Sequence, residues 1–194
     1  MAQFWDYSAM AQTNGKLTAF PAFIKVAGKR ALVVGNGEEA LAKCRLLSET
    51  EAHIVLIADV PSADLSTFVE KSGIEHVNAA FSPELLDGAV MAFGATGDSA
   101  ADRAVVTAAR AAGVLANAVD QPDYCDFYTP ALVSRAPLAV AIGTEGASPV
   151  LAQSIRARID QMLPPALGSV LRLAQSYRHA VEMLLPKGNP RRQF

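Results

Sequence analysis

Short apolar runs alternate with polar or helix-patterned segments along most of the chain. Four runs rich in Val, Ile, Leu and Ala predict strands, at residues 31–34, 54–58, 90–95 and 114–119, and the more polar residues 75–79 are a candidate for a fifth. The segments between them carry helical spacing or helix-start signals. Strands that alternate with helices predict a parallel sheet with crossover helices. We therefore expect an α/β domain whose ligands bind beyond the carboxyl ends of the strands.

Several connecting segments carry helix signals. Residues 38–49 place apolar side chains on one helical face, at every third residue from Leu41 to Leu47. A shorter helix is expected within residues 61–72. The run Ser99-Ala100-Ala101-Asp102 matches a capping box, which predicts a long helix with Ser99 as its N-cap.

The pattern changes after Pro122. Residues 132–133 and 138–142 predict two strands with no helix between them, and residues 149–162 and 166–185 predict two amphipathic helices. So few elements cannot bury their own apolar faces. We expect either a second subunit or the first domain to cover them.

A glycine-rich turn joins the first predicted strand to the first helix. Gly35, Gly37 and Ala40 fit the G-x-G-x-x-G/A template of dinucleotide binding. Gly35 allows a tight turn, Gly37 lets a pyrophosphate approach the backbone, and Ala40 lets the helix pack close to the strand. The N–H groups at the helix N-terminus then attract the anion. The alternative is an ordinary glycine-rich turn, which is common between a strand and a helix.

Acidic and polar residues follow the other predicted strands. Asp59 lies about 20 residues beyond the glycines, where a ribose-binding carboxylate is expected. Such an acid favours NAD over NADP, because a 2′-phosphate would meet its negative charge. The alternative is that Asp59 starts a turn before Pro61. Because Gly35, Thr96 and Asp120 also end predicted strands, we expect them at the same edge of the sheet as Asp59.

Composition narrows the class of function. The chain has 194 residues, of which 51% are hydrophobic, and its net charge of −2 argues against a general nucleic-acid binder. No apolar run reaches the roughly 18 residues that a membrane helix needs, and residues 1–16 lack the pattern of a secretory signal. Two cysteines make no disulfide framework, and His53, His76 and His179 lack metal-ligand spacing. We expect a cytoplasmic protein without a resident metal.

The block from Asn117 to Ala152 identifies a family. It contains Asn117-Ala118-Val119-Asp120, Cys125-Asp126-Phe127, Arg135-Ala136-Pro137-Leu138 and the run Ala141-Ile142-Gly143-Thr144-Glu145-Gly146-Ala147-Ser148-Pro149-Val150-Leu151-Ala152. These residues resemble the dehydrogenase and ferrochelatase module of siroheme synthase. The resemblance starts near Phe20 and covers nearly all of the remaining chain.

The resemblance implies a domain organisation and a reaction. An N-terminal tail (1–16) precedes an NAD-binding Rossmann domain (17–129), a dimerisation segment (130–163) and a small helical domain (164–194). Precorrin-2 is oxidised by NAD to sirohydrochlorin, and many members then insert Fe²⁺ to complete siroheme biosynthesis. The expected partners are the tetrapyrrole and a second copy of the chain. The alternatives are a dehydrogenase with a separate chelatase, and a non-catalytic dimer that binds NAD or a tetrapyrrole.

The resemblance also assigns roles to residues. Asp120 matches the catalytic aspartate, whose carboxylate can act as a base; the alternative is a turn starter before Pro122. The expected cofactor contacts are Gly35, Asn36, Gly37, Glu38, Glu39, Asp59, Val60 and Thr96. The expected substrate contacts are Asn117, Arg135 and Thr144, the last aligned with a serine that can be phosphorylated in some members. Arg156 and Arg158 are further candidates for clamping substrate carboxylates.

Three residues depart from the family pattern. Asn36 stands where Gly is usual, Gly97 replaces a carboxylate, and Glu145 adds a charge beside the Thr144 hydroxyl. We expect NAD binding to tolerate Asn36, since it lies between the two glycines that the template requires. The family module can be fused to a C-terminal methyltransferase, and the sequence leaves open whether this chain stands alone or is part of such a fusion.

Overall fold

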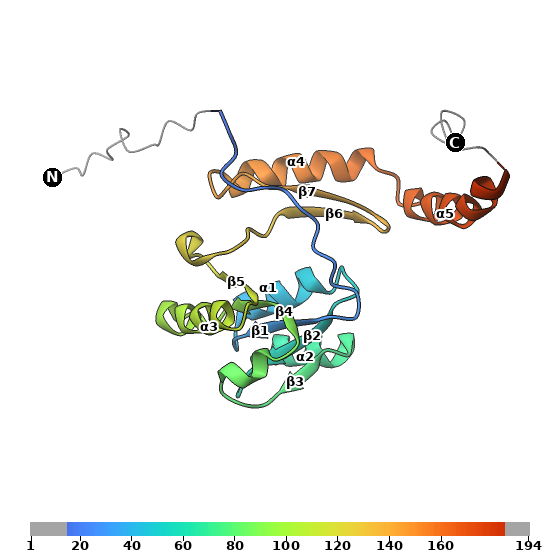
Figure 1. Cartoon of the computed structure of the whole chain (residues 1–194). Helices are drawn as coiled ribbons and strands as arrows, with labels where there is room; N and C mark the ends of the chain where they lie inside the picture. The colour runs from blue at the N-terminus through green and yellow to red at the C-terminus, as the bar shows by residue number, and fades with distance from the viewer. Residues whose placement is uncertain (1–14, 185–194) are drawn as a thin grey trace.

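The computed structural model describes residues 15–184, with residues 179–184 given by their backbone alone. The expected N-terminal tail lies almost entirely outside the described residues, and the side chain of His179 lies outside them too. The described chain forms two bodies, one above the other in Figure 1. The lower body is an α/β domain, and the upper one combines a strand pair with helices.

The lower body is built on a five-stranded parallel sheet in the order β3-β2-β1-β4-β5. Its strands are β1 (Arg30–Val34), β2 (His53–Ile57), β3 (Glu75–Val77), β4 (Ala89–Gly94) and β5 (Leu115–Ala118). The chain starts in the middle, winds outward to one side and then crosses to the other. Such a reversal of strand order, here between β1 and β4, is where dinucleotides bind in this class of fold. The predicted parallel α/β sheet is confirmed.

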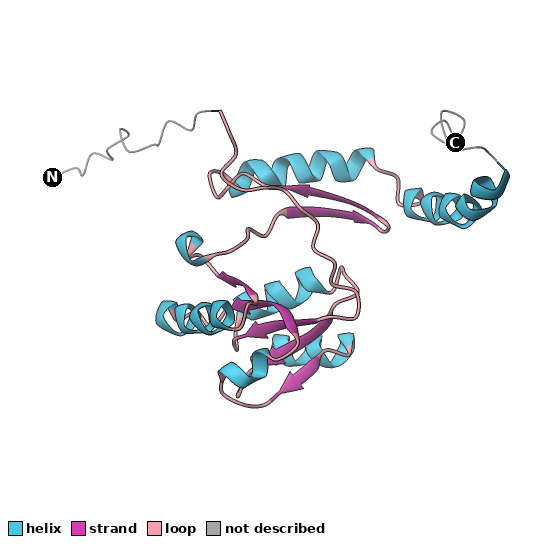
Figure 2. Ribbon diagram, viewed as in Figure 1, coloured by secondary structure: helices cyan, strands magenta, loops and turns pink. Residues whose placement is uncertain are grey.

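Helices cover both faces of the sheet (Figure 2). The helices α1 (Glu38–Leu47) and α2 (Ala63–Ser72) pack on one face, while α3 (Ser99–Ala111) and the 3-10 helix η2 (Pro83–Leu86) pack on the other. In β1, Ala31 and Val33 join the first layer, and Leu32 and Val34 join the second. Because β1, β2 and β4 are buried on both faces, they appear in the sequence as continuous apolar runs, whereas the edge strand β3 is polar and exposed.

The start of α3 differs from the prediction. Its N-cap is Asp98, whose carboxylate accepts hydrogen bonds from the N–H groups of Ala100 and Ala101, so Ser99 is already helical. Asp102 does not cap the helix, because its buried carboxylate accepts hydrogen bonds from Thr96 instead. The predicted capping box is therefore wrong. The carboxylate one residue earlier reaches the first-turn donors, and Ser99 is left inside the helix.

The upper body follows the 3-10 helix η3 (Pro122–Tyr124). It consists of the antiparallel strands β6 (Ala131–Arg135) and β7 (Leu138–Ile142) and the helices α4 (Pro149–Met162) and α5 (Leu167–Leu184). Figure 1 shows α4 along the strand pair and α5 beyond its turn. As predicted, Ser148 caps α4 with a bond from the N–H of Leu151. Gly168 keeps α5 close to the turn, because a Cβ there would lie 2.5 Å from the carbonyl oxygen of Ala136.

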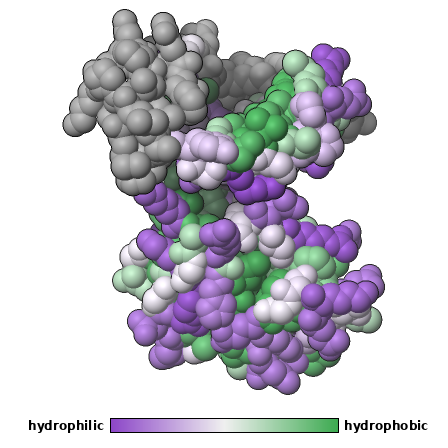
Figure 3. All heavy atoms as spheres, turned by 90° about the vertical axis from the view of Figure 1, so that its right-hand side faces the viewer, coloured by the Kyte–Doolittle hydropathy of each residue, from purple (hydrophilic) through white to green (hydrophobic). Residues whose placement is uncertain are grey.

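The upper body leaves apolar side chains exposed. Among its described apolar side chains, only Val133 and Ala152 are buried. The exposed ones on α4 and α5 include Val150, Leu151, Met162, Val170, Leu173 and Tyr177. Figure 3, which views the molecule from the right-hand side of Figure 1, shows hydrophobic residues at the surface of this body. The first domain therefore does not cover these helices, and the predicted boundaries at residues 130 and 164 stay predictions.

Candidate functional site

Four candidate residues follow the ends of four neighbouring strands. Asp59 comes after β2, Gly35 after β1, Thr96 after β4 and Asp120 after β5, which is their order across the sheet. With strands about 4.8 Å apart, the line spans roughly 14 Å. An extended dinucleotide can follow this line, with a ribose near Asp59, the pyrophosphate near Gly35 and the reactive end toward Asp120.

The loop between β1 and α1 fits a pyrophosphate. Gly35 lies at φ 149°, and a Cβ there would stand 1.9 Å from the carbonyl oxygen of Ala95. A Cβ on Gly37 would meet nothing within 4 Å, so the space in front of this residue is open. No side chain among the described residues caps the start of α1. Its first-turn N–H groups therefore suit an anion.

The remaining predicted cofactor contacts surround this loop. Glu38 and Glu39 lie in the first turn of α1, where their N–H groups rather than their carboxylates suit a phosphate. Val60 is 76% exposed, and its N–H donates to Asp59 Oδ1. Cofactor binding by these residues stays a prediction.

A buried carboxylate holds Thr96. The N–H and the hydroxyl of Thr96 both donate to Asp102 Oδ1, at 2.9 and 2.7 Å. Gly94 allows this approach, because a Cβ there would lie 2.9 Å from the Cα of Asp102. The hydroxyl of Thr96 is thus bound within the protein, and cofactor binding by Thr96 stays a prediction. The sequence analysis missed this role of Asp102 because it assigned the side chain to a helix cap.

Asp120 adopts a left-handed backbone conformation with φ 56°. A positive φ is uncommon in a residue other than glycine, and such residues cluster at functional sites. The turn places the exposed Asp120 on the wall of a cavity of about 370 Å³. The two interpretations of Asp120 therefore coincide, since it begins a turn and also faces a cavity.

The cavity lies between the two bodies. One wall comes from α1, the end of β5 and residues 121–131, and the other comes from the β7–α4 loop and the start of α4. Its polar lining includes Lys43, Asn117, Asp120, Thr144, Glu145 and Gln153. The structure thus brings Asn117 and Thr144 together with Asp120. It does not bring Arg135, Arg156 or Arg158 to this wall.

Arg135 lies at the far end of β6. Its guanidinium forms an ion pair with Asp160 at 2.9 Å and donates to the carbonyl oxygen of Leu163 at 3.1 Å. Since β6 has five residues, Arg135 is about 13 Å from Ala131 at the cavity. Arg135 fastens α4 to the strand pair, and a contact with substrate stays a prediction.

Lys43 is a cavity residue that the sequence analysis missed. It is the only Lys, Arg or His among the described residues that line the cavity, whereas Asp120 and Glu145 supply negative charge. Burial lowers the pKa of Lys43, and the charges of Cys125, Asp120 and Glu39 oppose that shift. An ammonium group in this place can receive a carboxylate of a bound ligand. A single lysine on a helix gives no periodic or motif signal by which it could have been found.

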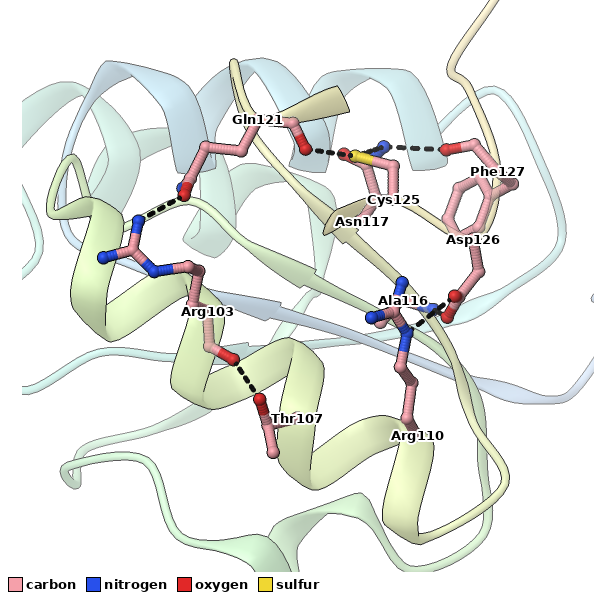
Figure 4. A network of polar contacts seen from close by, with 9 residues as sticks. All are labelled: Arg103, Thr107, Arg110, Ala116, Asn117, Gln121, Cys125, Asp126 and Phe127. Carbon is pink, nitrogen blue, oxygen red and sulfur yellow. Dashed lines mark hydrogen bonds and ion pairs between the residues drawn. The ribbon is translucent and has the colours of Figure 1, made fainter. Parts of the chain in front are cut away.

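Asn117 organises the floor of the cavity (Figure 4). Its Nδ2 donates to the carbonyl oxygen of Phe127 at 2.9 Å and to Cys125 Sγ at 3.2 Å. Arg110 on α3 pairs with Asp126 at 2.8 Å in the same network. Burial raises the pKa of the Cys125 thiol. This environment fits the predicted packed thiol better than a nucleophile.

The β7–α4 loop is bonded to the N-terminal segment. The Glu145 carboxylate accepts hydrogen bonds from the N–H groups of Ala19 and Thr18, at 2.8 and 2.7 Å, and these bonds lower the pKa of Glu145. Glu145 also has a positive φ of 50°. Beside it, Thr144 Oγ1 accepts a hydrogen bond from the N–H of Ser148 at 3.2 Å.

Within residues 15–184, no three His, Cys, Asp or Glu side chains gather as a metal site. None of the helices in this part of the chain is long and apolar enough to cross a membrane.

The fold and the line of strand-end residues define a dinucleotide-binding protein of the Rossmann class. Residues 22–131 match the model of the family described as "Putative NAD(P)-binding", and the chain belongs to this family. Among curated proteins, it is similar to the siroheme synthase of Chromobacterium violaceum, with 39% identity over 175 residues. The siroheme synthase of Pseudomonas aeruginosa is 38% identical over 174 residues.

Each of these two alignments covers 90% of this chain and 37% of the relative, so the chain spans little more than a third of their length. Among solved structures, it resembles one described as "SirC, precorrin-2 dehydrogenase" with a TM-score of 0.78 and 22% identity. That alignment covers 90% of this chain and 86% of the other. At this identity the similarity shows a shared fold.

Proposed function

We propose that this chain oxidises precorrin-2 to sirohydrochlorin, with NAD as the hydride acceptor. The similarity to siroheme synthases and the fold shared with a precorrin-2 dehydrogenase support this assignment. The position of Asp120 carries it. Asp120 lies at one end of the strand-end line that begins with the ribose-side Asp59, and it also faces the cavity between the two bodies.

The oxidation removes a hydride and a proton from the tetrapyrrole. NAD supplies the hydride acceptor when it is bound. The Asp120 carboxylate is exposed on the cavity wall, where it can take the proton. Lys43 lies in the same cavity and provides a positive charge for one of the substrate carboxylates.

Insertion of Fe²⁺ into sirohydrochlorin is the second step of the proposal. This step requires the pyrrole N–H protons to leave, and Asp120 is a base in the same cavity. Iron is a substrate in this step, so the protein needs to hold it only briefly. The alternative is a dehydrogenase with a separate chelatase. Iron insertion into supplied sirohydrochlorin, compared with a no-protein control, separates the two, and equal rates would remove the chelatase step.

A homodimer completes the proposal. The exposed apolar side chains of α4 and α5, such as Leu151, Val170 and Tyr177, support a second copy as their cover. Sedimentation velocity at micromolar concentration should show a dimer, and a monomer would contradict this part of the proposal.

The unpaired Cys44 and Cys125 suit a reducing compartment, so we assign the protein to the cytoplasm.

The decisive experiment measures NADH formation from freshly generated precorrin-2 with the parent chain and with Asp120→Asn. The parent should turn over, and the variant should lose about 10²- to 10⁴-fold in rate while its affinity for NAD is unchanged. Equal rates would remove Asp120 from the chemistry. A parent that binds NAD and tetrapyrrole without turnover would instead support the non-catalytic alternative.

A further inference from the structure

We propose that Asn36 is a positioning residue that orients the Asp59 carboxylate toward the ribose and thereby sets a preference for NAD over NADP. This inference rests on the proposed NAD-dependent function. It concerns two residues whose side chains meet at the edge of the sheet, one after β1 and one after β2. Asn36 also stands where the resembled family usually has Gly, which has no side chain to make this bond.

The Asp59 carboxylate has one oxygen engaged by two donors. Asn36 Nδ2 donates to Asp59 Oδ1 at 2.7 Å, and the N–H of Val60 donates to the same oxygen at 2.8 Å. Two donors on one oxygen fix the rotation of the carboxylate group. Oδ2 receives neither bond, and Asp59 is exposed. Oδ2 is therefore the acceptor that remains for a ribose hydroxyl.

Asn36 is itself held in place by the neighbouring turn. Its carbonyl oxygen accepts a hydrogen bond from the N–H of Ser62 at 2.8 Å, and Ser62 is the N-cap of α2. On the other side, the N–H of Gly35 donates to the carbonyl oxygen of Ile57 at 3.1 Å. Asn36 thus connects the loop that fits the pyrophosphate with the acid that faces the ribose. The two contacts are held as one unit before the dinucleotide arrives.

The charge on Asp59 makes this geometry selective. Hydrogen bonds, that of Asn36 above all, lower the pKa of Asp59 and keep its carboxylate ionised. An ionised carboxylate only accepts hydrogen bonds, so it suits the hydroxyls of an unmodified ribose. A 2′-phosphate offers negative charge in their place. Asn36 is uncharged and directs one amide N–H to Asp59, so it supplies no positive charge that could offset the repulsion of a 2′-phosphate.

The test compares the dissociation constants of NAD and NADP by titration calorimetry on the whole chain. The parent should bind NAD more tightly than NADP. Asn36→Ala should lower the affinity for NAD about three- to tenfold, because one charge-assisted hydrogen bond that orients the carboxylate is lost. Its affinity for NADP should stay nearly unchanged. Asn36→Gly, which introduces the residue usual in the resembled family, should change the ratio of the two dissociation constants as Asn36→Ala does. Ser62→Ala, which keeps its N–H for Asn36, serves as the matched control and should leave the ratio unchanged.

Two outcomes would overturn the inference, and they are distinguishable. If both Asn36 variants leave the ratio of the NAD and NADP dissociation constants unchanged, Asn36 does not set the preference. The inference then fails while NAD binding stands. If the parent binds neither dinucleotide, the proposed NAD-dependent function fails as well. Circular dichroism of each variant checks that a change in the ratio comes from folded protein.

Discussion

One oxygen of the Asp102 carboxylate, Oδ1, accepts hydrogen bonds from both the backbone N–H and the hydroxyl of Thr96. The two residues lie on either side of the turn that leaves β4, next to the proposed nicotinamide end of the site. Asp102 is buried, so its carboxylate depends on these donors in place of water. The pair therefore stabilises the fold and shapes the site at the same place.

We expect Asp102→Asn to lower the free energy of unfolding by about 1–3 kcal/mol, since the neutral amide oxygen is a weaker acceptor and its NH₂ group would be buried where the carboxylate has an oxygen. Thr96→Val should cost about 1 kcal/mol through loss of the hydroxyl. Urea denaturation measures both. Because the two substitutions act on the same hydrogen bond, the double variant should lose less than the sum of the single losses. Strict additivity would contradict the pairing.

The glycines at positions 35 and 37 should separate folding from binding. Gly35→Ala should cost more than about 3 kcal/mol or prevent folding, because its Cβ would overlap the carbonyl oxygen of Ala95. Gly37→Ala has open space and should change stability by less than about 0.5 kcal/mol. The added methyl group should still lower the affinity for NAD about tenfold or more, because it would occupy the space where the pyrophosphate approaches. A Gly37→Ala protein that binds NAD as the parent does would contradict the predicted phosphate loop.

Replacing Lys43 by Met should affect substrate binding more than catalysis. Lys43 is the only basic side chain among the described cavity residues. The proposed tetrapyrrole substrate carries several carboxylates. We expect KM for precorrin-2 to rise about tenfold with a smaller change in kcat, which corresponds to loss of one charge-assisted contact. Lys43→Arg keeps the charge and is the matched control. If both variants lose kcat equally at unchanged KM, Lys43 does not hold the substrate.

Lys43 also predicts a dependence on pH. Burial lowers its pKa in the folded protein, so between the folded and unfolded values the unfolded chain binds more protons. Stability from this group should therefore increase as the pH rises through that alkaline window. Acetylation rates of Lys43, followed by mass spectrometry, should reach half their plateau at lower pH in folded protein than in urea. A midpoint that is the same in both states would contradict the assigned environment.

Glu145 should hold the N-terminal segment against the β7–α4 loop. In Glu145→Gly, the amides of Thr18 and Ala19 lose their acceptor, so hydrogen exchange in a peptide that covers them should become faster. Glycine accepts the positive φ of this position easily, so the loop itself should keep its conformation. Glu145→Gln retains an acceptor and should show an intermediate effect. Unchanged exchange in both variants would mean that these bonds do not hold the segment in solution.

Most of the sheet could be predicted from the sequence because β1, β2 and β4 are buried on both faces and leave uninterrupted apolar runs. The strand-end placement of Asp59 and Asp120 followed from the same pattern, since parallel strands all end at one edge. The capping box failed because Asp98, one position earlier, begins the helix and accepts the N–H groups of Ala100 and Ala101. Local patterns alone do not decide between adjacent polar residues.

The cavity could not be predicted from local patterns. Its walls meet only through tertiary packing of the β7–α4 loop opposite α1, and Lys43 takes its role from that packing. Likewise, the bond between Thr18 and Glu145 joins positions 127 residues apart. Arg135 shows the converse, because its chemistry suits a substrate carboxylate while the structure pairs it with Asp160.

The division of the cavity between two bodies has a thermodynamic consequence. A ligand that touches both α1 and the β7–α4 loop acts as a reversible cross-link between the two bodies. Its measured affinity then includes the free energy of holding the two bodies in one relative orientation. Substitutions in residues 125–130, which connect the two bodies, would then alter affinity for the tetrapyrrole even where they do not touch it, while affinity for the dinucleotide stayed the same.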